Sequence, residues 1–340
     1  MKAILYKPGR GAVLAEIPEP QIGPEEALIA VDACGLCGSD LLKLVDPHVT
    51  GPILGHEVAG RIARLGAMVK NFKVGDRVIV AHHVPCLTCH FCRRGHPSMC
   101  AHFRATNIEP GGFAETVAVS AKHLEHTVLK IPEGLDSFSA TFTEPLACCL
   151  RNVKRVRVVE GDTVGVVGLG SIGLLTGQLL KHFKATVVGF DLDASRIAVA
   201  REMGFIVPDG DNAKQTIFRL TEGRGLDSLI FTAGGPELAA ERLPWLRGGG
   251  TLSIFAEFSR QEGARAIAQL DLNEIYHREL TITSSYSPSL QDLRESLDLI
   301  ASKSVDVSRL ADRRFSLADF DRAVRLTKSR EVLKAIMVPS

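Results

Sequence analysis

The pattern of hydrophobic and polar positions along the chain changes character at about residue 150. Before that point, short runs rich in β-branched residues are separated by Gly and Pro. This pattern predicts an irregular, mostly antiparallel β domain. Its clearest strand candidates are 27–31, 58–65, 77–81 and 113–119.

Beyond residue 150, predicted strands and amphipathic helices alternate. The strand candidates are 163–167, 186–190, 205–207, 228–231, 251–255 and 280–283. The helical patterns between them are 172–183, 194–203, 213–220 and 236–246. Such alternation predicts an α/β domain with a doubly wound parallel sheet of the Rossmann type. Two more helices, 290–302 and 317–327, and a closing strand, 334–338, follow.

Length and composition fit two ordinary globular domains. The chain has 340 residues, of which 45% are hydrophobic and 23% charged, and its formal net charge is +1. This charge favours neither a nucleic-acid nor a membrane partner. The charge-free stretch 163–180 carries five glycines, so we interpret it as a buried strand and helix and not as a bilayer span. Without a signal-peptide pattern after Met1, we expect a cytoplasmic protein.

A glycine motif lies between the first predicted Rossmann strand and its helix. Gly168, Gly170 and Gly173 form G-x-G-x-x-G, with Ser171 and Ile172 inside it. The three glycines would permit a tight turn, close approach of a pyrophosphate and close helix packing, and the helix N-terminus would attract the phosphate charge.

An acidic residue supports this interpretation. Asp191 follows the second strand, eighteen residues after Gly173, where a carboxylate binds ribose hydroxyls and repels a 2′-phosphate. We therefore predict NAD in preference to NADP. Arg196 leaves the preference open, because a guanidinium there would tolerate the phosphate or simply face solvent.

Four cysteines with metal-ligand spacing lie within the segment 83–103. They form C-x2-C-x2-C-x7-C, a spacing that wraps four thiolates around one zinc ion. Because four sulfurs fill a tetrahedron, we predict a structural zinc with no position for substrate. The ligands are Cys86, Cys89, Cys92 and Cys100.

A second set of ligand-type residues is scattered through the first half of the chain. Cys37 lies in a G-x-C-G-S-D sequence, His56 and Glu57 follow Gly55, and Glu144 precedes Pro145. A thiolate, an imidazole and two carboxylates leave a coordination position open on zinc. Spacing alone does not decide the matter, because buried Cys and His residues are more often part of the core.

Together these motifs, in this order, resemble the zinc-containing medium-chain dehydrogenase/reductase family, and the likeness extends from Met1 to the final strand. Glu144-Pro145-Leu146 is similar to the sorbitol (L-iditol) dehydrogenase branch. The resemblance implies a GroES-like catalytic domain formed by 1–150 and 289–340, joined to a Rossmann domain, 151–288, with the active site in the cleft between them. It also implies homo-oligomers, dimers or tetramers.

The resemblance assigns roles to single residues. Cys37, His56 and Glu57 would hold a catalytic zinc, with Glu144 as fourth ligand or as hydrogen-bond partner of the zinc's water. Ser39 would pass the substrate proton outward, and Asp40 would support His56. The implied reaction takes a hydride from a secondary alcohol or polyol to NAD and gives a ketone or ketose, with zinc as Lewis acid.

Two departures from the family pattern leave the substrate open. The segment 41–44 lacks the aromatic residue usual after C-G-S-D, and Ser285 stands where an arginine often precedes Tyr286. Lys43 would meet an anionic group or simply face solvent. A cyclitol, an amino-cyclitol or a polyol phosphate is therefore the alternative substrate. Both zinc sets, together with Asp191, count against an NADPH-dependent reductase of quinones or enones. The near-zero net charge and the intact glycine motif count against a zinc module that only recognises a partner such as nucleic acid.

The roles expected for a few more residues rest on their positions in the predicted elements. Thr232, Ala233, Phe255 and Ser285 lie at the ends of predicted Rossmann strands, and cofactors bind beyond the carboxyl ends of such strands. Four histidines near the cysteines could compete as zinc ligands, but surface or packing roles are expected for them because four cysteines already complete a tetrahedron. They are His82, His83, His90 and His96. A solvated helix face is expected for Arg151, Lys154, Arg155 and Arg157. Cys34 forms C-x-x-C with Cys37, but we favour core packing over a redox role.

Overall fold

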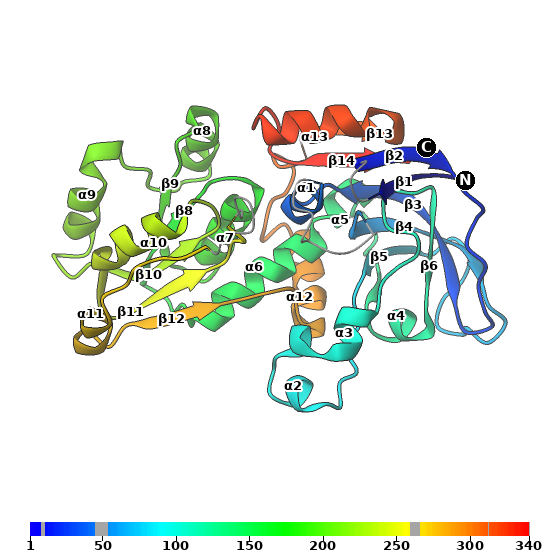
Figure 1. Cartoon of the computed structure of the whole chain (residues 1–340), viewed down its shortest axis with the longest axis horizontal. Coiled ribbons are helices and arrows are strands. Elements are labelled where there is room, and N and C mark those ends of the chain that lie inside the picture. Colours follow the sequence, from blue (N-terminus) through cyan, green and yellow to red (C-terminus); the bar gives the residue numbers. More distant parts are fainter. Residues whose placement is uncertain (8–10, 45–53, 259–265, 312, 340) are drawn as a thin grey trace. The chain divides into compact units, whose positions relative to one another are not determined.

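The computed structural model describes residues 1–340 except 8–10, 45–53, 259–265, 312 and 340. The chain forms two compact units (Figure 1). One, the catalytic unit, comprises Met1–Ala147 and Pro288–Ser340, and the other, the nucleotide unit, comprises Cys148–Ser287. Each unit has a hydrophobic core of its own, centred on residues such as Ile29 and Phe113 in the first and Leu229 and Phe231 in the second.

A seven-stranded sheet organises the catalytic unit. Its order is β13-β14-β3-β4-β5-β7, with β6 also paired to β3, and every pair is antiparallel except β13 with β14. A separate hairpin pairs β1 with β2. The strands are β1 (Lys2–Lys7), β2 (Gly11–Glu16), β3 (Ala27–Gly35), β4 (Glu57–Leu65), β5 (Arg77–Ala81), β6 (Thr116–Val119), β7 (Val128–Lys130), β13 (Arg313–Ser316) and β14 (Ala335–Val338).

The helices of the catalytic unit are mostly short. They are α1 (Gly38–Lys43), α2 (His90–Arg93), α3 (Ala101–Ala105), α4 (Ala121–His126), α5 (Ser137–Ala140), α12 (Leu290–Ala301) and α13 (Phe320–Lys328). Helix α6 (Thr143–Val156) begins in this unit. A single 3-10 turn, Leu317–Asp319, precedes α13, so the helix predicted from 317 begins three residues later.

The register of the sheet brings three distant segments to one edge. Gly35, at the end of β3, pairs with Glu57, at the start of β4. Glu57 pairs in turn with Ala81, at the end of β5. Because neighbouring strands lie about 5 Å apart, the residues just beyond these ends become neighbours in space.

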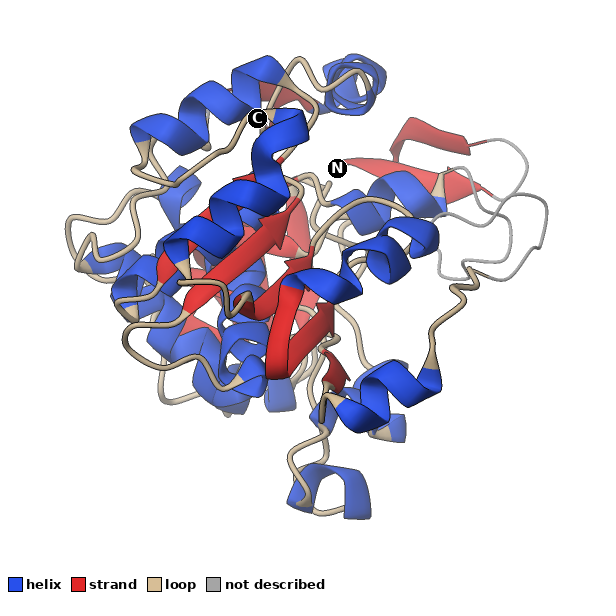
Figure 2. Cartoon of the chain, turned by 90° about the vertical axis from the view of Figure 1, so that its left-hand side faces the viewer, coloured by secondary structure: helices blue, strands red, loops and turns tan. Residues whose placement is uncertain are grey.

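A five-stranded parallel sheet forms the centre of the nucleotide unit, in the order β12-β11-β10-β8-β9. Figure 2 shows these strands with helices packed around them. The strands are β8 (Thr163–Val167), β9 (Thr186–Phe190), β10 (Leu226–Phe231), β11 (Leu246–Ile254) and β12 (Thr281–Ser284). The helices are α7 (Ser171–His182), α8 (Ala194–Glu202), α9 (Ala213–Leu220), α10 (Pro236–Arg242) and α11 (Leu272–His277). The predicted combination of a GroES-like β domain and a Rossmann sheet is confirmed.

Three local predictions were wrong. The segment 205–207 makes only an isolated parallel bridge, Val188 with Ile206, because Pro208 follows and has no N–H to continue a ladder. The helix predicted for 236–246 ends at Arg242, and Pro244 turns the next residues into a 3-10 segment. Arg151 is not solvated: its side chain is buried and donates hydrogen bonds to the carbonyls of Tyr286 and Ser287.

The charge-free stretch 163–180 folds as β8 followed by most of α7. No helix in the described part of the chain is long and apolar enough to cross a membrane.

Candidate metal and nucleotide sites

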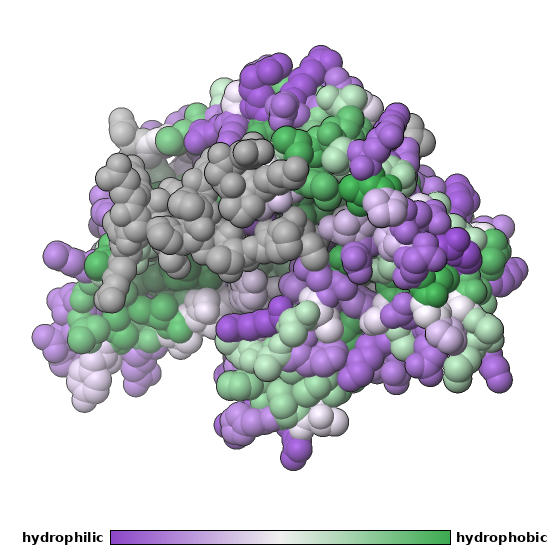
Figure 3. Space-filling view, turned by 45° about the vertical axis from the view of Figure 1, so that its right-hand side comes forward, coloured by the Kyte–Doolittle hydropathy of each residue, from purple (hydrophilic) through white to green (hydrophobic). Residues whose placement is uncertain are grey.

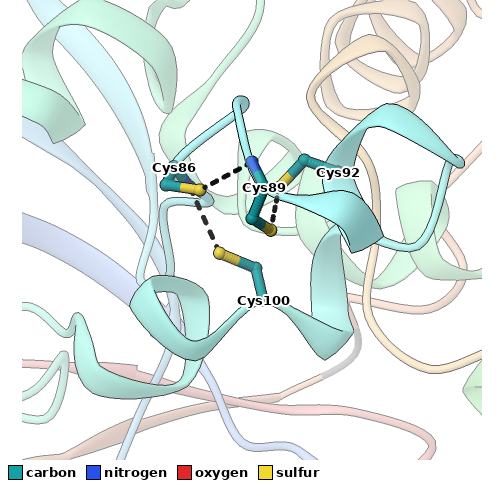
Figure 4. Close-up of side chains that lie close together, drawn as sticks. All are labelled: Cys86, Cys89, Cys92 and Cys100. Carbon is teal, nitrogen blue, oxygen red and sulfur yellow. Dashed lines mark hydrogen bonds between the residues drawn. The ribbon is translucent and has the colours of Figure 1, made fainter.

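The four cysteines of the segment 83–103 point toward one another (Figure 4). Their sulfur atoms all lie within 4.8 Å of one another. Backbone N–H groups donate to two of the sulfurs: Cys86 to the Sγ of Cys100, and Cys89 to the Sγ of Cys86, each at 3.4 Å. Such bonds stabilise thiolates, so the loop suits a tetrahedral zinc ion and fits the predicted structural site.

These thiols differ in their readiness to lose a proton. Hydrogen bonds from Thr88, and then from the backbone of Cys89, lower the pKa of Cys86 to about 5. Burial, and then the hydrogen bond to the neighbouring Cys89, raise the pKa of Cys92 to about 12. A metal entering this loop would therefore find one thiolate formed and would have to displace a proton from another.

A second group of metal-binding atoms lies at the edge of the sheet where β3 ends and β4 begins. One ligand atom each of Cys37, His56 and Glu57 lies within 4.8 Å of the others. Cys37 precedes α1, His56 directly precedes β4 and Glu57 begins it, so the antiparallel pairing of β3 and β4 brings the three residues together. Thiolate, imidazole and carboxylate are the three donor types that leave a zinc ion open to a further ligand.

Asp40 ties the two loops of this group to each other. Its carboxylate is fully buried and accepts hydrogen bonds from the backbone N–H of Cys37 and of Gly55, both at 3.0 Å. The same carboxylate lies 3.6 Å from Nδ1 of His56, which leaves Nε2 for a metal. The predicted support of His56 by Asp40 therefore has a geometric basis, and Asp40 also fixes the backbone of both ligand loops.

Charges within this group shift the pKa values of its members. Burial alone would lower the pKa of His56, but the negative charges of Asp40 and then Cys37 outweigh it and raise the pKa well above its usual range. Burial would raise the pKa of Asp40, and the charge of His56 outweighs it and lowers that pKa. The carboxylate of Asp40 therefore favours a positive charge at the position of His56.

Glu57 has a buried cationic partner that sequence reasoning missed. Both of its carboxylate oxygens lie 2.6 Å from Nζ of Lys334, and the two side chains are only 0% and 4% exposed. The ammonium group donates to Oε1, whereas Oε2 is buried without a hydrogen-bond donor in the described structure. Oε2 thus lies against the ammonium group without accepting a hydrogen bond from it, and one carboxylate oxygen of Glu57 belongs to the three-atom group that could hold zinc.

A glycine makes room for this carboxylate. A Cβ atom at Gly35 would lie 1.9 Å from Oε2 of Glu57 and 3.0 Å from Cε of Lys334. No other residue could stand at this position without displacing the buried pair. The G-x-C-G motif therefore contributes space as well as a ligand.

The remaining predicted catalytic residues lie near this group but outside it. Glu144, in the first turn of α6, is buried and lines a small cavity together with His82 and His83. It is not within the group of three ligand atoms that lie within 4.8 Å of one another. Ser39, in α1, is half-buried, and its hydroxyl has no hydrogen-bond partner among the described residues.

The C-x-x-C cysteine Cys34 is a buried free thiol. Burial, together with the charges of Asp40 and Glu57, raises its pKa well above the usual range. A thiol that does not ionise is a poor redox nucleophile, in keeping with the core-packing interpretation.

The glycine motif of the nucleotide unit forms the turn between β8 and α7. Gly168 has φ +91°, a left-handed conformation that favours glycine, and a Cβ at Gly173 would lie 1.8 Å from the carbonyl oxygen of Gly168. At Gly170 a Cβ would meet only the guanidinium of Arg196, at 3.6 Å. The turn thus leaves open space above Gly170, and Ser171 and Ile172 begin the helix whose N–H groups face it.

Asp191 and Arg196 stand beside this turn. The carboxylate of Asp191 accepts hydrogen bonds from the backbone N–H of Leu169 at 2.6 Å and from those of Leu192 and Asp193. Oδ1 accepts from both Leu192 and Asp193, whereas Oδ2 accepts only from Leu169 and keeps a lone pair for a ribose hydroxyl. Nε of Arg196 is buried without a partner in the described structure. The pyrophosphate and the adenosine ribose of a dinucleotide fit these donors and acceptors.

The other predicted cofactor contacts divide into two kinds. The hydroxyl of Thr232 lies within hydrogen-bond distance of the carbonyls of Val167 and Gly168, and Ala233 packs against Gly168, so both residues support the glycine turn. Phe255 and Ser285 directly follow β11 and β12. Oγ of Ser285 is buried with no hydrogen-bond partner in the part of the chain that the structure describes.

The fold, the glycine turn and the two metal groups define a zinc-containing dehydrogenase that uses a nicotinamide dinucleotide. The sequence matches two families: "Alcohol dehydrogenase GroES-like domain" over residues 23–133 and "Zinc-binding dehydrogenase" over residues 171–302.

Similar proteins cover almost the whole chain. A sorbitol dehydrogenase of Halalkalibacterium halodurans is 32% identical over 95% of this chain and 94% of its own. A D-altritol 5-dehydrogenase of Agrobacterium fabrum is 31% identical over 94% of both chains. The crystal structure of galactitol-1-phosphate dehydrogenase from Escherichia coli matches all of both chains with TM-score 0.84 and 25% identity. The chain belongs to the zinc-type medium-chain alcohol dehydrogenase family and is a zinc-dependent NAD(P) alcohol or polyol dehydrogenase.

Proposed function

We propose that this dehydrogenase oxidises a secondary hydroxyl of a polyol, with NAD as hydride acceptor. The substrate carbon gives its hydride to NAD and the hydroxyl proton leaves to solvent, so the products are a ketone or ketose, NADH and a proton. The observation that carries the proposal is the convergence of Cys37, His56 and Glu57 at one edge of the sheet. Two of the similar proteins are named for polyols, sorbitol and D-altritol.

The roles of single residues follow from this chemistry. A zinc ion held by Cys37, His56 and Glu57 would supply the Lewis acidity that favours loss of the substrate's hydroxyl proton. Glu144, which stands outside the three-ligand group, serves as a further ligand or as acceptor for a water beside it. Ser39, whose hydroxyl has no partner among the described residues, receives the substrate proton and passes it outward.

Coenzyme preference rests on Asp191 and Arg196. The fixed carboxylate of Asp191 favours the free ribose hydroxyls of NAD and repels the 2′-phosphate of NADP. The guanidinium of Arg196 near Gly170 offsets part of this repulsion. We propose NAD as the preferred coenzyme, with NADP as a weaker alternative.

The test is NADH formation in mildly alkaline buffer with a panel of polyols, cyclitols, polyol phosphates and simple secondary alcohols. Turnover of a neutral polyol that is lost on chelation and restored by zinc supports the proposal. Failure to oxidise any alcohol with either NAD or NADP refutes it.

A polyol phosphate is the second candidate substrate. Lys43 ends α1 and is half-buried, and its charge is one of the influences on the pKa of His82, after burial and the neighbouring imidazoles. One of the similar structures is a galactitol-1-phosphate dehydrogenase. In the same panel, turnover confined to phosphorylated polyols would favour this candidate, and loss of that turnover in Lys43→Met would assign the phosphate to Lys43.

We also propose that the protein forms homo-oligomers. The edge strand β12 exposes Ile282 by 44%, and the neighbouring helix α11 exposes Leu272 by 75% and Tyr276 by 77%. The lower edge of Figure 3 also shows apolar surface. In the segment carrying α2 and α3, Leu87 is 43% and Phe91 47% exposed. Exposed edges and apolar patches of this kind mark association sites. Sedimentation equilibrium tests this: a dimer or tetramer is expected, and a monomer at micromolar concentration refutes it.

A further inference from the structure

His82 and His83 were expected to serve surface or packing roles, but they line a cavity. The cavity wall also contains Glu144, and the rest of it is apolar or aromatic. Its other lining residues are Ala81, Pro85, Phe103, Pro288, Leu290 and Leu293. The space has room for about one water-sized group.

The two imidazoles connect this cavity to the candidate catalytic metal group. The ring of His82 lies 4.8 Å from that of His56 and 3.8 Å from that of His83, centroid to centroid. The ring of His83 lies 4.7 Å from that of Phe103. His82 follows Ala81, which pairs with Glu57 across the β4–β5 ladder, so the register of the sheet fixes this placement. One residue that lines the cavity, His82, is thus in ring contact with a predicted metal ligand, His56.

The hydrogen-bonding capacity of the pair is mostly unused. Nδ1 of His83 faces the carbonyl of Thr106 and therefore carries the proton, which leaves Nε2 as an acceptor when the ring is neutral. The side chain of His82 has no hydrogen bond within the described parts of the chain, although its backbone carbonyl accepts one from His123.

We propose that His82 and His83 bind a second hydroxyl group of the substrate, on the carbon next to the one that is oxidised. A hydroxyl both donates and accepts, which matches one imidazole donor and one imidazole acceptor. It also matches the size of the space. A phosphate matches neither, because it offers acceptors only and would face the acceptor nitrogen of His83 and the carboxylate of Glu144. The proposal rests on the proposed function and narrows its substrate class to vicinal diols.

The experiment compares butane-2,3-diol with butan-2-ol, which differ only in the second hydroxyl. The measured quantity is the ratio of kcat/KM for the diol to that for the mono-ol, in wild type, His82→Phe and His82→Gln. Phe keeps the ring and removes both nitrogens, whereas Gln keeps a donor and an acceptor. We expect His82→Phe to lower the ratio about tenfold, equivalent to about 1.4 kcal/mol, while His82→Gln retains most of it.

Two controls separate recognition from damage to the metal site. His126→Phe makes the same change on α4, outside the cavity, and should leave the ratio unchanged. Zinc content is measured in each variant, because His82 contacts the ring of His56. If neither alcohol is a substrate, the best alcohol of the panel and its analogue lacking the neighbouring hydroxyl replace them.

The outcomes are distinct. A ratio that falls in His82→Phe with zinc retained supports the proposal. The proposal is overturned if His82→Phe lowers kcat/KM equally for both alcohols or leaves the diol to mono-ol ratio unchanged. It is also overturned if the wild type does not prefer the diol. Each of these results leaves the proposed dehydrogenase function intact. Absence of turnover with every alcohol instead refutes the proposed function itself.

Discussion

The buried pair of Glu57 and Lys334 allows a quantitative prediction. Lys334→Met keeps most of the aliphatic stem and removes the ammonium group, so the carboxylate of Glu57 loses its buried counter-charge. Both side chains are almost fully buried, and both carboxylate oxygens lie 2.6 Å from Nζ. Removing one partner of such a pair costs about 3–5 kcal/mol, because the other charge is left uncompensated. We expect this loss in the metal-free protein.

Zinc should reduce the loss. An ion bound by Cys37, His56 and Glu57 would itself neutralise the carboxylate, so the zinc-loaded variant should be destabilised less than the metal-free one. By linkage, the difference between the destabilisation of the metal-free variant and that of the zinc-loaded variant equals the gain in zinc-binding free energy. About 1.4 kcal/mol of this difference corresponds to tenfold tighter zinc binding. Lys334→Met should therefore be less stable without metal and yet bind the catalytic zinc more strongly than wild type.

The assay is urea unfolding followed by far-ultraviolet circular dichroism, with chelator and with excess zinc. Lys184→Met is the matched control, because its 3.1 Å pair with Glu160 is exposed and should contribute at most about 1 kcal/mol. The double variant Lys334→Met/Glu57→Gln should recover stability, since it removes the orphaned charge. If Lys334→Met costs no more than Lys184→Met, or if the double variant is less stable than the single one, the reasoning is wrong.

Three further predictions concern the zinc and coenzyme sites. Cys37→Ala should abolish turnover and leave NADH binding, followed by fluorescence titration, unchanged; full activity would remove Cys37 from the catalytic set. Asp191→Ala should lower the ratio of kcat/KM with NAD to that with NADP at least about tenfold, and an unchanged ratio would contradict the ribose role. In metal-free protein at neutral pH, iodoacetamide should modify Cys86 well before Cys92, because the pKa of Cys86 is lowered to about 5 and that of Cys92 raised to about 12. Lowering the pH through about 5 should suppress the Cys86 reaction, and mass spectrometry that finds equal rates would refute the assignment.

Features encoded by residues close together in the sequence could be predicted. The turn from β8 through Gly168 into α7 depends on consecutive residues, so its pattern predicted the fold, which is confirmed, and a nucleotide site at this turn. The four cysteines likewise lie within one short segment, and their spacing alone indicated a metal.

Features that depend on strand register could not be predicted. Lys334 and Glu57 are 277 residues apart in the chain, and only the neighbouring positions of β14, β3 and β4 bring them together. His82 follows β5 and meets His56 only through the pairing of β5 with β4. Arg151 was misjudged because a basic residue on a helix usually faces solvent, whereas here two backbone carbonyls receive its guanidinium.

Because of Asp40, the two metal groups differ in how far their shape depends on a bound ion. Its buried carboxylate holds the loops of Cys37 and His56 through protein hydrogen bonds, so these loops keep their places when the ion leaves. In the loop of Cys86 and Cys100, the hydrogen bonds to the sulfur atoms come from the loop itself, so we expect its four thiols to need the ion to stay together. The position formed by Cys37, His56 and Glu57 is therefore kept in shape by the protein, whereas the four-cysteine position depends on its ion. Cobalt or cadmium should exchange into the position of Cys37, His56 and Glu57 in folded protein. Exchange at the four-cysteine position should require local unfolding and proceed far more slowly.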